Sequence, residues 1–369
     1  MNNKNFQVYF DCGFSKVRAG IFNKDDLDEA FYSESRFFTD HLSLDLEIQK
    51  IITSFEKDTS EYIENISLML DSPKMLSIGI SISKKLDGLK LKQDTIQFLI
   101  QEAKQQILKY YENYDIAHII INNYKIDDVD YSYLPDEINC HFISLDIFFI
   151  CLPNDLVMYF KNIFSKSNIS VNKVICSSYV KSTNYKNNLN LKGHSSFIDV
   201  GFNKTSIISY LDNNILSLDV LPIGGNHITK DISKILMIDL KKSEQVKLNF
   251  DKNNKLSTYG DFPLEKLRKI IFARTEEILE LCAKSVESNS FVLGQFKMVL
   301  MGEGSKILDN SHIDKISFSN DIDFLEETLE DICQSGFKFG TKINKQEVVV
   351  IPKKQINQGF FERLFHILR

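Results

Sequence analysis

The chain has 369 residues, 43% of them hydrophobic, and a formal net charge of −6. This length exceeds that of most single domains, so we expect two or more lobes. Proteins that bind nucleic acid usually carry an excess of positive charge, whereas this chain is net negative. Nucleic acid is therefore not an expected partner.

Six cysteines are scattered along the chain without a Cys-x-x-Cys pair. This spacing disfavours a zinc site and a disulfide framework, so a reducing cytoplasmic compartment is expected. The first ten residues, MNNKNFQVYF, carry no secretory signal. The sequence contains no uninterrupted run of about 18 apolar residues, so no membrane-crossing helix is predicted.

The N-terminal part begins with short apolar runs separated by turn residues. Residues 6–33 predict three strands, joined first by a Gly-Phe-Ser-Lys turn and then by an acidic turn. Residues 44–57 place apolar side chains at helical spacing, and residues 65–71 predict a further strand.

The middle of the chain alternates helices and strands. The predicted elements are a helix over 91–110, strands over 117–127 and 141–152, a helix over 154–168 and a strand over 171–178. The polar segment 183–194 is expected to be a connection into residues 197–220. Those residues repeat the strand–turn–strand pattern of residues 6–33, which indicates an internal duplication.

The second half is more helical. Helices are predicted over 224–236, 242–250 and 264–287, and residues 296–307 predict a strand that runs into a Gly-x-Gly turn. From about residue 341 the pattern loosens into a polar, lysine-bearing linker before the chain ends GFFERLFHILR.

Four turns carry the candidate chemistry. In the first, Gly13 allows backbone amides to approach a phosphate, Ser15 and Lys16 line the turn, and Asp11 is placed to hold hydrated Mg²⁺. An ordinary hairpin turn explains the same residues equally well. The second turn has the same layout, but Phe202 stands where a phosphate loop would place glycine, which by itself favours a hairpin.

The other two turns precede helical segments. Gly224 and Gly225 open a helix whose first turn carries Thr229, a pattern that suits either an anion site or a plain N-cap. A lone Gly302-x-Gly304 followed by Ser305 is a weak signal. No catalytic triad or metal-ligand cluster is spaced usefully, so the catalytic residues remain unassigned.

The last eleven residues predict an amphipathic helix. At helical spacing, one arc is apolar and comprises Phe360, Phe361, Leu364, Phe365, Ile367 and Leu368. Such a helix behind a polar linker is typical of an interfacial membrane anchor. The alternative is a terminal helix that docks on the body of the protein.

The order of these turns resembles the nucleotide cleft of the actin-like ATPase superfamily, and within it the bacterial cell-division protein family FtsA. Three features carry the FtsA resemblance: the segment inserted between the two hairpin modules, the run LPIGGNHITKDI followed by SEQVKLNF, and the amphipathic end. The resemblance implies an α/β, two-lobed fold with a duplicated βββαβαβα core. The implied organisation is lobe 1 over 1–82, an FtsA-type inserted subdomain over 83–168, a return to lobe 1 over 169–198, lobe 2 over 199–340 with a small helical subdomain at about 231–297, a flexible linker over 341–358 and a membrane-targeting helix over 359–369.

The resemblance also implies ATP with Mg²⁺ in the cleft, with Asp11 and Asp199 holding the metal through water. The implied nucleotide-binding residues are Asp11, Gly13, Ser15, Lys16, Asp199, Gly201, Asn203, Lys204, Thr205, Gly224, Gly225, Thr229, Glu244, Lys247, Gly302, Glu303, Gly304 and Ser305. Glu244 and Lys247 correspond to the pair near the ribose and base. The second turn departs from the family pattern, because Phe202 and Asn203 replace glycines and Ser206 replaces an aspartate. Glu303 likewise replaces a glycine of the adenosine turn.

The function that follows from the resemblance is a peripheral tether at the division site, on the cytoplasmic face of the cell membrane. Its implied partners are FtsZ, copies of itself, membrane lipid and later division proteins of the septum. Hydrolysis of ATP is expected to be slow at most, because no strong general base is evident. The alternatives are a sugar-kinase-superfamily phosphotransferase or hydrolase, a PilM-type pilus assembly ATPase, and a nucleotide-free scaffold.

Overall fold

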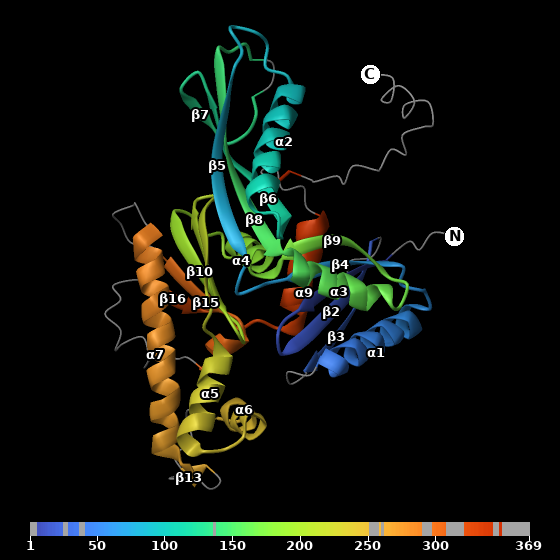
Figure 1. Ribbon diagram of the computed structural model, residues 1–369, viewed down its shortest axis with the longest axis vertical. Helices are drawn as coiled ribbons and strands as arrows, with labels where there is room; N and C mark the ends of the chain where they lie inside the picture. Colours follow the sequence, from blue (N-terminus) through green and yellow to red (C-terminus); the bar gives the residue numbers. More distant parts are fainter. Residues whose placement is uncertain are drawn as a thin grey trace.

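The computed structural model describes residues 6–24, 29–36, 41–135, 138–250, 258–259, 262–289, 297–307, 321–341 and 347–348. Two five-stranded sheets, one in each of two lobes, flank a central region, and a third sheet projects from them (Figure 1). None of the helices in the described ranges is long and apolar enough to cross a lipid bilayer.

Lobe 1 is built on a sheet with the strand order β3-β2-β1-β4-β9. Its strands are β1 (Phe6–Cys12), β2 (Lys16–Asn23), β3 (Ala30–Arg36), β4 (Asn65–Leu70) and β9 (Ser170–Cys176). The first three are antiparallel neighbours, whereas β4 and β9 run parallel to β1. Helices α1 (His41–Thr59), α3 (Asn154–Ser165) and α9 (Leu329–Thr341) pack on this lobe. Because helices cover both of its faces, β1 and β2 are almost wholly buried.

Lobe 2 repeats this design, which confirms the predicted duplication. Its sheet has the order β12-β11-β10-β15-β16, with three antiparallel strands followed by two parallel ones. The strands are β10 (His194–Val200), β11 (Thr205–Leu211), β12 (Asn214–Leu221), β15 (Lys297–Met301) and β16 (Asp321–Phe324). The long helix α7 (Leu264–Asn289) packs on β11 and β12.

A third sheet, of order β5-β8-β6-β7, stands above the two lobes with helix α2 (Gln93–Tyr110) on one side (Figure 1). Its strands are β5 (Leu76–Lys85), β6 (Tyr114–Ile126), β7 (Val129–Tyr131) and β8 (Phe142–Pro153). The sheet and helix share a hydrophobic core of their own. Hydrogen bonds from Ser77 Oγ to the Leu218 carbonyl (2.8 Å) and from Asn122 Nδ2 to the Ile215 carbonyl (2.7 Å) attach the sheet to β12.

The observed bounds of this unit differ from the predicted segment 83–168. The sheet begins at Leu76, because β5 is a single ten-residue strand that pairs along its whole length with β8. Helix α3 belongs to lobe 1 instead, since the Phe164 ring packs edge-on against Phe10 of β1 at 5.0 Å.

Helix α4 (Ser177–Asn188) is among the elements that the sequence analysis did not predict. Its second half falls in the segment expected to be a polar connection. The helix is buried between the lobes even though it carries serine, asparagine and lysine. Its hydroxyls bond internally, as in the 2.7 Å contact between Ser182 Oγ and the Tyr210 hydroxyl. An apolar stripe is therefore not what holds this helix in place.

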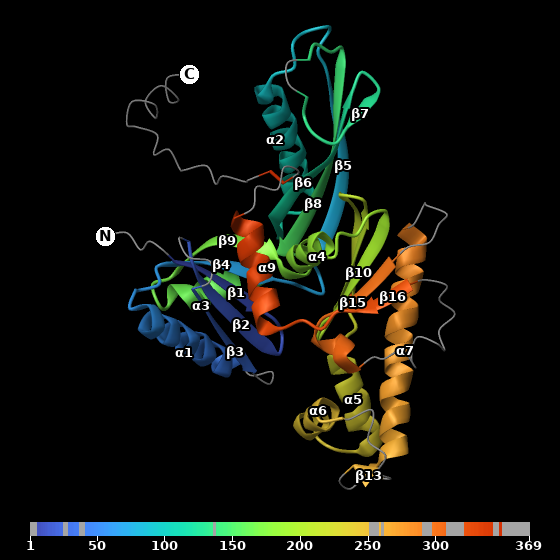
Figure 2. The same ribbon diagram turned by 180° about the vertical axis from the view of Figure 1, so that it is seen from behind.

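A small helical unit hangs below lobe 2 (Figure 2). It comprises α5 (Gly225–Leu236), α6 (Leu240–Leu248), the strand pair β13 (Thr258–Tyr259) and β14 (Phe262–Pro263), and the first turns of α7. Ile228 and Ile232 of α5 pack with Val246 of α6 and Leu267 of α7 in a separate hydrophobic cluster. The predicted helices over 224–236, 242–250 and 264–287 are thereby confirmed.

Residues 347–348 lie within the predicted flexible linker, yet they pair with β6. Glu347 forms a bridge with Ile120, and the Val348 N–H donates to the Ile119 carbonyl at 2.9 Å. The buried ring of His118 holds the same segment, because its Nδ1 bonds Glu347 Oε1 at 2.7 Å. These two residues therefore differ from the prediction of a free linker, while the predicted helix over 359–369 lies outside the described residues.

Gly20 permits close contact between β2 and α9. A Cβ atom at this position would lie 2.8 Å from the Cβ of Cys333, so we expect Gly20→Ala to lower the free energy of unfolding by about 1–3 kcal/mol. The matched change Gly79→Ala, on β5, meets no atom within 4 Å and should stay within about 0.5 kcal/mol. Urea unfolding followed by circular dichroism measures both, and equal midpoints would contradict this account of the packing.

Candidate functional site

Two neighbouring cavities lie between the lobes, on the side where the hairpin turns meet. The larger measures about 240 Å³. Its predicted site residues are Ser15, Lys16, Gly201, Gly225, Glu244, Lys247, Glu303 and Gly304. The smaller measures about 90 Å³. Its predicted site residues are Asp11, Gly13, Ser15, Lys16, Asp199, Gly201, Asn203, Lys204, Gly302 and Glu303.

Four predicted site residues do not line either cavity and act within the protein instead. Thr205 Oγ1 donates to the Ile223 carbonyl at 2.8 Å, and Ser305 Oγ donates to the Gly302 carbonyl at 2.7 Å. Thr229 is fully buried and donates to Glu244. Gly224 meets the second turn so closely that a Cβ atom there would lie 2.4 Å from the Gly201 carbonyl oxygen.

The first turn places charged side chains side by side at the end of β1 and the start of β2. The Gly13 N–H donates to the Lys16 carbonyl at 2.9 Å and closes the turn. Asp11 accepts from Arg18 at 3.0 Å and from Ser177 Oγ at 2.7 Å. Both oxygens of this buried carboxylate therefore have protein partners.

The second turn is closed in the same way, with the Gly201 N–H bonded to the Lys204 carbonyl at 2.9 Å. Lys204 is buried and pairs with Asp71, which follows β4 in lobe 1, at 2.9 Å. Its Nζ also donates to Ser206, the residue that stands where the family pattern has an aspartate.

The entry to α5 is not open for an anion. The Gly225 N–H donates to the Gly201 carbonyl at 3.0 Å, and the Asn226 N–H donates to the Phe202 carbonyl at 2.7 Å. A helix N-terminus binds anions through free amides. Since carbonyls of the second turn already accept from these two, the predicted anion site does not fit this geometry.

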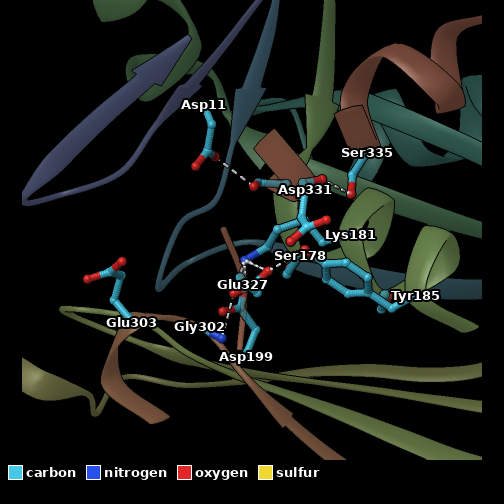
Figure 3. A network of polar contacts seen from close by, with 12 residues as sticks. Asp11, Ser178, Lys181, Tyr185, Asp199, Gly302, Glu303, Glu327, Asp331 and Ser335 are labelled. Atoms are coloured by element: carbon cyan, nitrogen blue, oxygen red, sulfur yellow. Dashed lines mark hydrogen bonds and ion pairs between the residues drawn. The ribbon is translucent and has the colours of Figure 1, made fainter. Parts of the chain in front are cut away.

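Lys181 of α4 is the charge at the centre of the polar network in Figure 3. It pairs with Asp199 at 3.1 Å and with Glu327 at 3.2 Å, and all three side chains are buried. Burial alone would lower the pKa of Lys181, but the two carboxylates raise it well above its ordinary value. The lysine is therefore held in its charged form.

The two carboxylates that pair with Lys181 have pKa values shifted in opposite directions. Burial would raise the pKa of Asp199, but Lys181 and Lys204 keep that pKa below its ordinary value. Burial dominates at Glu327 and raises its pKa. Glu327 also accepts from the Gly302 N–H at 2.6 Å and from the Tyr185 hydroxyl at 3.0 Å. These bonds connect α4, the turn after β15 and the segment before α9.

Glu303 is the carboxylate that replaces a glycine of the family pattern, and it lies apart from the Lys181 group in Figure 3. Lobe 1 supplies three cations to it: Lys16 at 3.3 Å, Arg18 at 3.4 Å and Arg36 at 3.0 Å. Lys306, three residues further along the chain, contributes at 3.3 Å. Burial would raise the pKa of Glu303, but these cations lower it to about 2.

Asp11 does not fit the role of a water-mediated magnesium ligand, and Asp199 is partly engaged. Each carboxylate already accepts from a buried cation, Arg18 or Lys181 respectively. No cluster of three or more histidine, cysteine, aspartate or glutamate ligands occurs among the described residues. Hydrated Mg²⁺ requires carboxylate oxygens that can accept from its waters. Both oxygens of Asp11 already accept from protein donors, whereas Asp199 is paired through Oδ2.

Glu244 and Lys247 lie together on α6 at the wall of the larger cavity. Lys247 Nζ pairs with Glu244 at 2.6 Å and donates to Thr229 Oγ1 at 2.8 Å. It also lies 5.4 Å from the centre of the Phe202 ring, a cation–π distance. This wall joins an apolar ring to a polar pair, the combination that holds a planar polar ligand.

Comparison with known proteins bears on the alternatives left open by the sequence. A sequence model of the family described as "Cell division protein FtsA" matches residues 196–271. The cell division protein FtsA of Buchnera aphidicola subsp. Schizaphis graminum is 25% identical over 267 residues, covering 68% of this chain and 62% of that one.

The chain is similar to FtsA proteins over these ranges.

Solved structures agree on the fold. The PilM-PilN type IV pilus biogenesis complex matches with a TM-score of 0.62 at 12% identity, covering 86% of this chain and 88% of that one. MreB5 of Spiroplasma citri bound to ADP matches with a TM-score of 0.50 at 13% identity, covering 92% and 97%. The fold is therefore that of the actin-like ATPases, with two mixed sheets. The chain spans about 62% of the length of its Buchnera relative.

Five charged residues of this cleft were not predicted from the sequence: Arg18, Arg36, Asp71, Lys181 and Glu327. Arg18 had a usable signal, because Lys16 and Arg18 are two residues apart on one strand and so share a face. Lys181 and Glu327 had none, since each lies in a polar or acidic run that resembles ordinary surface.

Lys181→Met leaves two buried carboxylates without their cation. We expect a loss of about 3–5 kcal/mol in the free energy of unfolding, the usual effect of breaking a buried pair. The control Lys269→Met removes an exposed pair with Glu265 at 3.7 Å and should cost less than about 1 kcal/mol. Denaturant midpoints compare the two variants. A loss at Lys181 no larger than at Lys269 would show that the buried network contributes little.

Proposed function

We propose that this chain is a membrane tether of the bacterial division machinery, which holds FtsZ filaments at the cytoplasmic face of the cell membrane at the division site. The observation that carries the proposal is the FtsA-family match over residues 196–271. That range runs from β10 through the second turn, α5 and α6 into α7. It therefore includes the helical unit that distinguishes lobe 2 from lobe 1.

The C-terminal apolar arc would supply the membrane contact. A helix with large side chains on one arc and Glu362, Arg363 and His366 on the other suits the boundary between headgroups and acyl chains. The bridge between Glu347 and Ile120 supports this arrangement, because it fixes the point from which the chain continues toward its end. His118 strengthens that point, since its Nε2 accepts from the Cys176 N–H at 2.8 Å and its Nδ1 faces Glu347.

The projecting unit formed by β5–β8 and α2 would be the FtsA-type inserted subdomain. Its support is its place in the chain, between the two hairpin modules, and its separate core. We assign it to self-association, because it projects beyond both lobes and presents apolar side chains such as Phe98 and Tyr133. Further division proteins would then join the assembled tether.

The small helical unit would bind FtsZ. Its outer surface exposes apolar side chains around the turn from α5 to α6: Ile235 (44% exposed), Met237 (92%) and Leu240 (44%). Met237 adopts a left-handed backbone conformation (φ 57°) at the end of α5, which directs the chain into α6. Such a grouping suits a short amphipathic peptide segment.

The larger cavity would hold the nucleoside end of ATP, with Phe202 and Lys247 at its wall. Hydrolysis would be slow at most, because the described cleft residues offer no free general base. The paired state of Asp11 and Asp199 argues against the Mg²⁺-dependent grip that the family resemblance implied. The cleft would therefore serve chiefly to set the shape of the protein.

A variant that lacks residues 359–369 but is otherwise complete should no longer bind membranes. Phe365→Asp should weaken binding to vesicles of phosphatidylethanolamine and phosphatidylglycerol by about tenfold or more, because burial of one Phe contributes about 1.5–3 kcal/mol. The control His366→Asp adds the same charge to the polar arc and should change binding much less. Vesicle co-sedimentation measures all three, and membrane binding that survives the deletion would overturn the anchor.

Met237→Glu should weaken co-sedimentation of the protein with FtsZ filaments by about tenfold, since it places a charge in the exposed apolar group of the helical unit. The control is Met158→Glu on α3, because Met158 is also an exposed methionine (52%) but lies on lobe 1. Equal loss in both variants would remove the helical unit from consideration as the FtsZ site.

A further inference from the structure

The two hairpin turns carry the same motif. Residues 11–16 read DCGFSK and residues 199–204 read DVGFNK, so both have the form Asp-x-Gly-Phe-x-Lys. In both, the glycine N–H donates to the lysine carbonyl at 2.9 Å. The turns are therefore equivalent in structure as well as in sequence, and each presents one lysine at the cleft.

The strands beside these turns end in equivalent carboxylates. In lobe 1 the register pairs Asp11 with Met69, and in lobe 2 it pairs Asp199 with Met301. Two residues beyond these methionines the chain reaches Asp71 and Glu303. The duplication thus places one carboxylate at the same position in each lobe.

Each lysine crosses the cleft to the carboxylate of the other lobe. Lys16 of lobe 1 pairs with Glu303 of lobe 2 at 3.3 Å, and Lys204 of lobe 2 pairs with Asp71 of lobe 1 at 2.9 Å. Both lysines are buried, with side chains 7% and 6% exposed. The two contacts are related by the same approximate symmetry that relates the lobes.

We propose that these two ion pairs form a reciprocal latch that holds the cleft closed without nucleotide. Asp71 and Glu303 take the place of phosphate as the anions that the turn lysines bind. The latch is independent of the tethering role, since it concerns only how the lobes close on each other.

Each latch carboxylate has further donors, as a substitute for phosphate must. Glu303 also forms ion pairs with Arg18 and Arg36 of lobe 1. Asp71 receives the Ser178 N–H at 3.2 Å and the Ser178 hydroxyl at 3.1 Å. Several charge-assisted bonds converge on each group, which is the pattern of a bound anion.

The charged side chains of the cleft already neutralise one another, which leaves little positive charge to bind an added phosphate. Among the described residues of this cluster, six cations face six carboxylates: Lys16, Arg18, Arg36, Lys181, Lys204 and Lys306 face Asp11, Glu34, Asp71, Asp199, Glu303 and Glu327. A triphosphate would add negative charge beside carboxylates that are already satisfied. It would therefore have to displace Glu303 from its three lobe 1 cations.

The test measures the distance between the lobes in the absence of nucleotide. All six cysteines are buried, so spin labels at Lys50→Cys on α1 and Lys269→Cys on α7 attach at exposed positions (side chains 70% and 77% exposed). We expect a single narrow distance for the otherwise unchanged chain. The double variant Asp71→Asn/Glu303→Gln should give a longer and broader distribution, and the surface control Glu265→Gln should not.

Two further measurements keep the proposal falsifiable if the double variant folds poorly. The single variants Asp71→Asn and Glu303→Gln should each broaden the distribution partially. Raising the salt concentration of the unmutated protein from 0.1 to 1 M should change it little, because salt screens buried ion pairs much less than exposed ones. A distribution that no variant alters would overturn the latch.

Calorimetry with ATP tests separately whether Glu303 occupies the place of phosphate. We expect Glu303→Gly to bind ATP at least tenfold more tightly than the unmutated chain, because it frees Lys16, Arg18 and Arg36 for phosphate. ATP binding of equal strength in both would overturn the claim that Glu303 substitutes for phosphate. If no protein binds ATP while the lobes still open in the variants, the latch stands and the proposed nucleoside pocket fails.

Discussion

Buried charge must be neutralised by a partner, and this requirement organises the centre of the molecule. Lys181 lies on a helix enclosed between two lobes, where an unpaired ammonium group would be strongly destabilising. Asp199 from lobe 2 and Glu327 from the segment before α9 satisfy it together. The same Glu327 fixes the turn after β15 through the Gly302 N–H. These contacts therefore help to fix the position of α4 between the lobes.

Apolar packing reinforces the closed arrangement. A single hydrophobic cluster extends from Phe10 in lobe 1 through Tyr179 on α4 to Phe197 and Met301 in lobe 2. Ion pairs add orientation to this apolar packing. The cross-cleft pairs of Lys16 and Lys204 determine which parts of the two turns face each other. In the proposed tethering role, such a fixed body would transmit force between a filament and a membrane.

Periodicity in the sequence was enough to predict most of the fold. Long amphipathic helices such as 264–287, and hairpins bounded by glycine, are determined by local pattern. The duplication was also visible, because both modules repeat strand, turn and strand. Helix α4 was missed because its buried face is polar and is satisfied by hydroxyl and lysine contacts from distant segments. Contacts between residues 146 positions apart, such as Lys181 and Glu327, leave no local signal. The turns were located correctly, but the internal pairing of their charges depended on partners from the other lobe.

The departures from the family pattern form one connected change in the structure. Phe202 replaces a glycine, and its carbonyl accepts from the Asn226 N–H while its ring covers Lys247. Ser206 replaces an aspartate and accepts from Lys204, which is thereby oriented toward Asp71. Glu303 replaces another glycine and receives three cations from the opposite lobe. In each case a group that would have contacted phosphate or its metal has an internal partner. Lys204 and Glu303 are paired across the cleft, so these two departures join the lobes, whereas Phe202 contacts Asn226 and Lys247 within lobe 2.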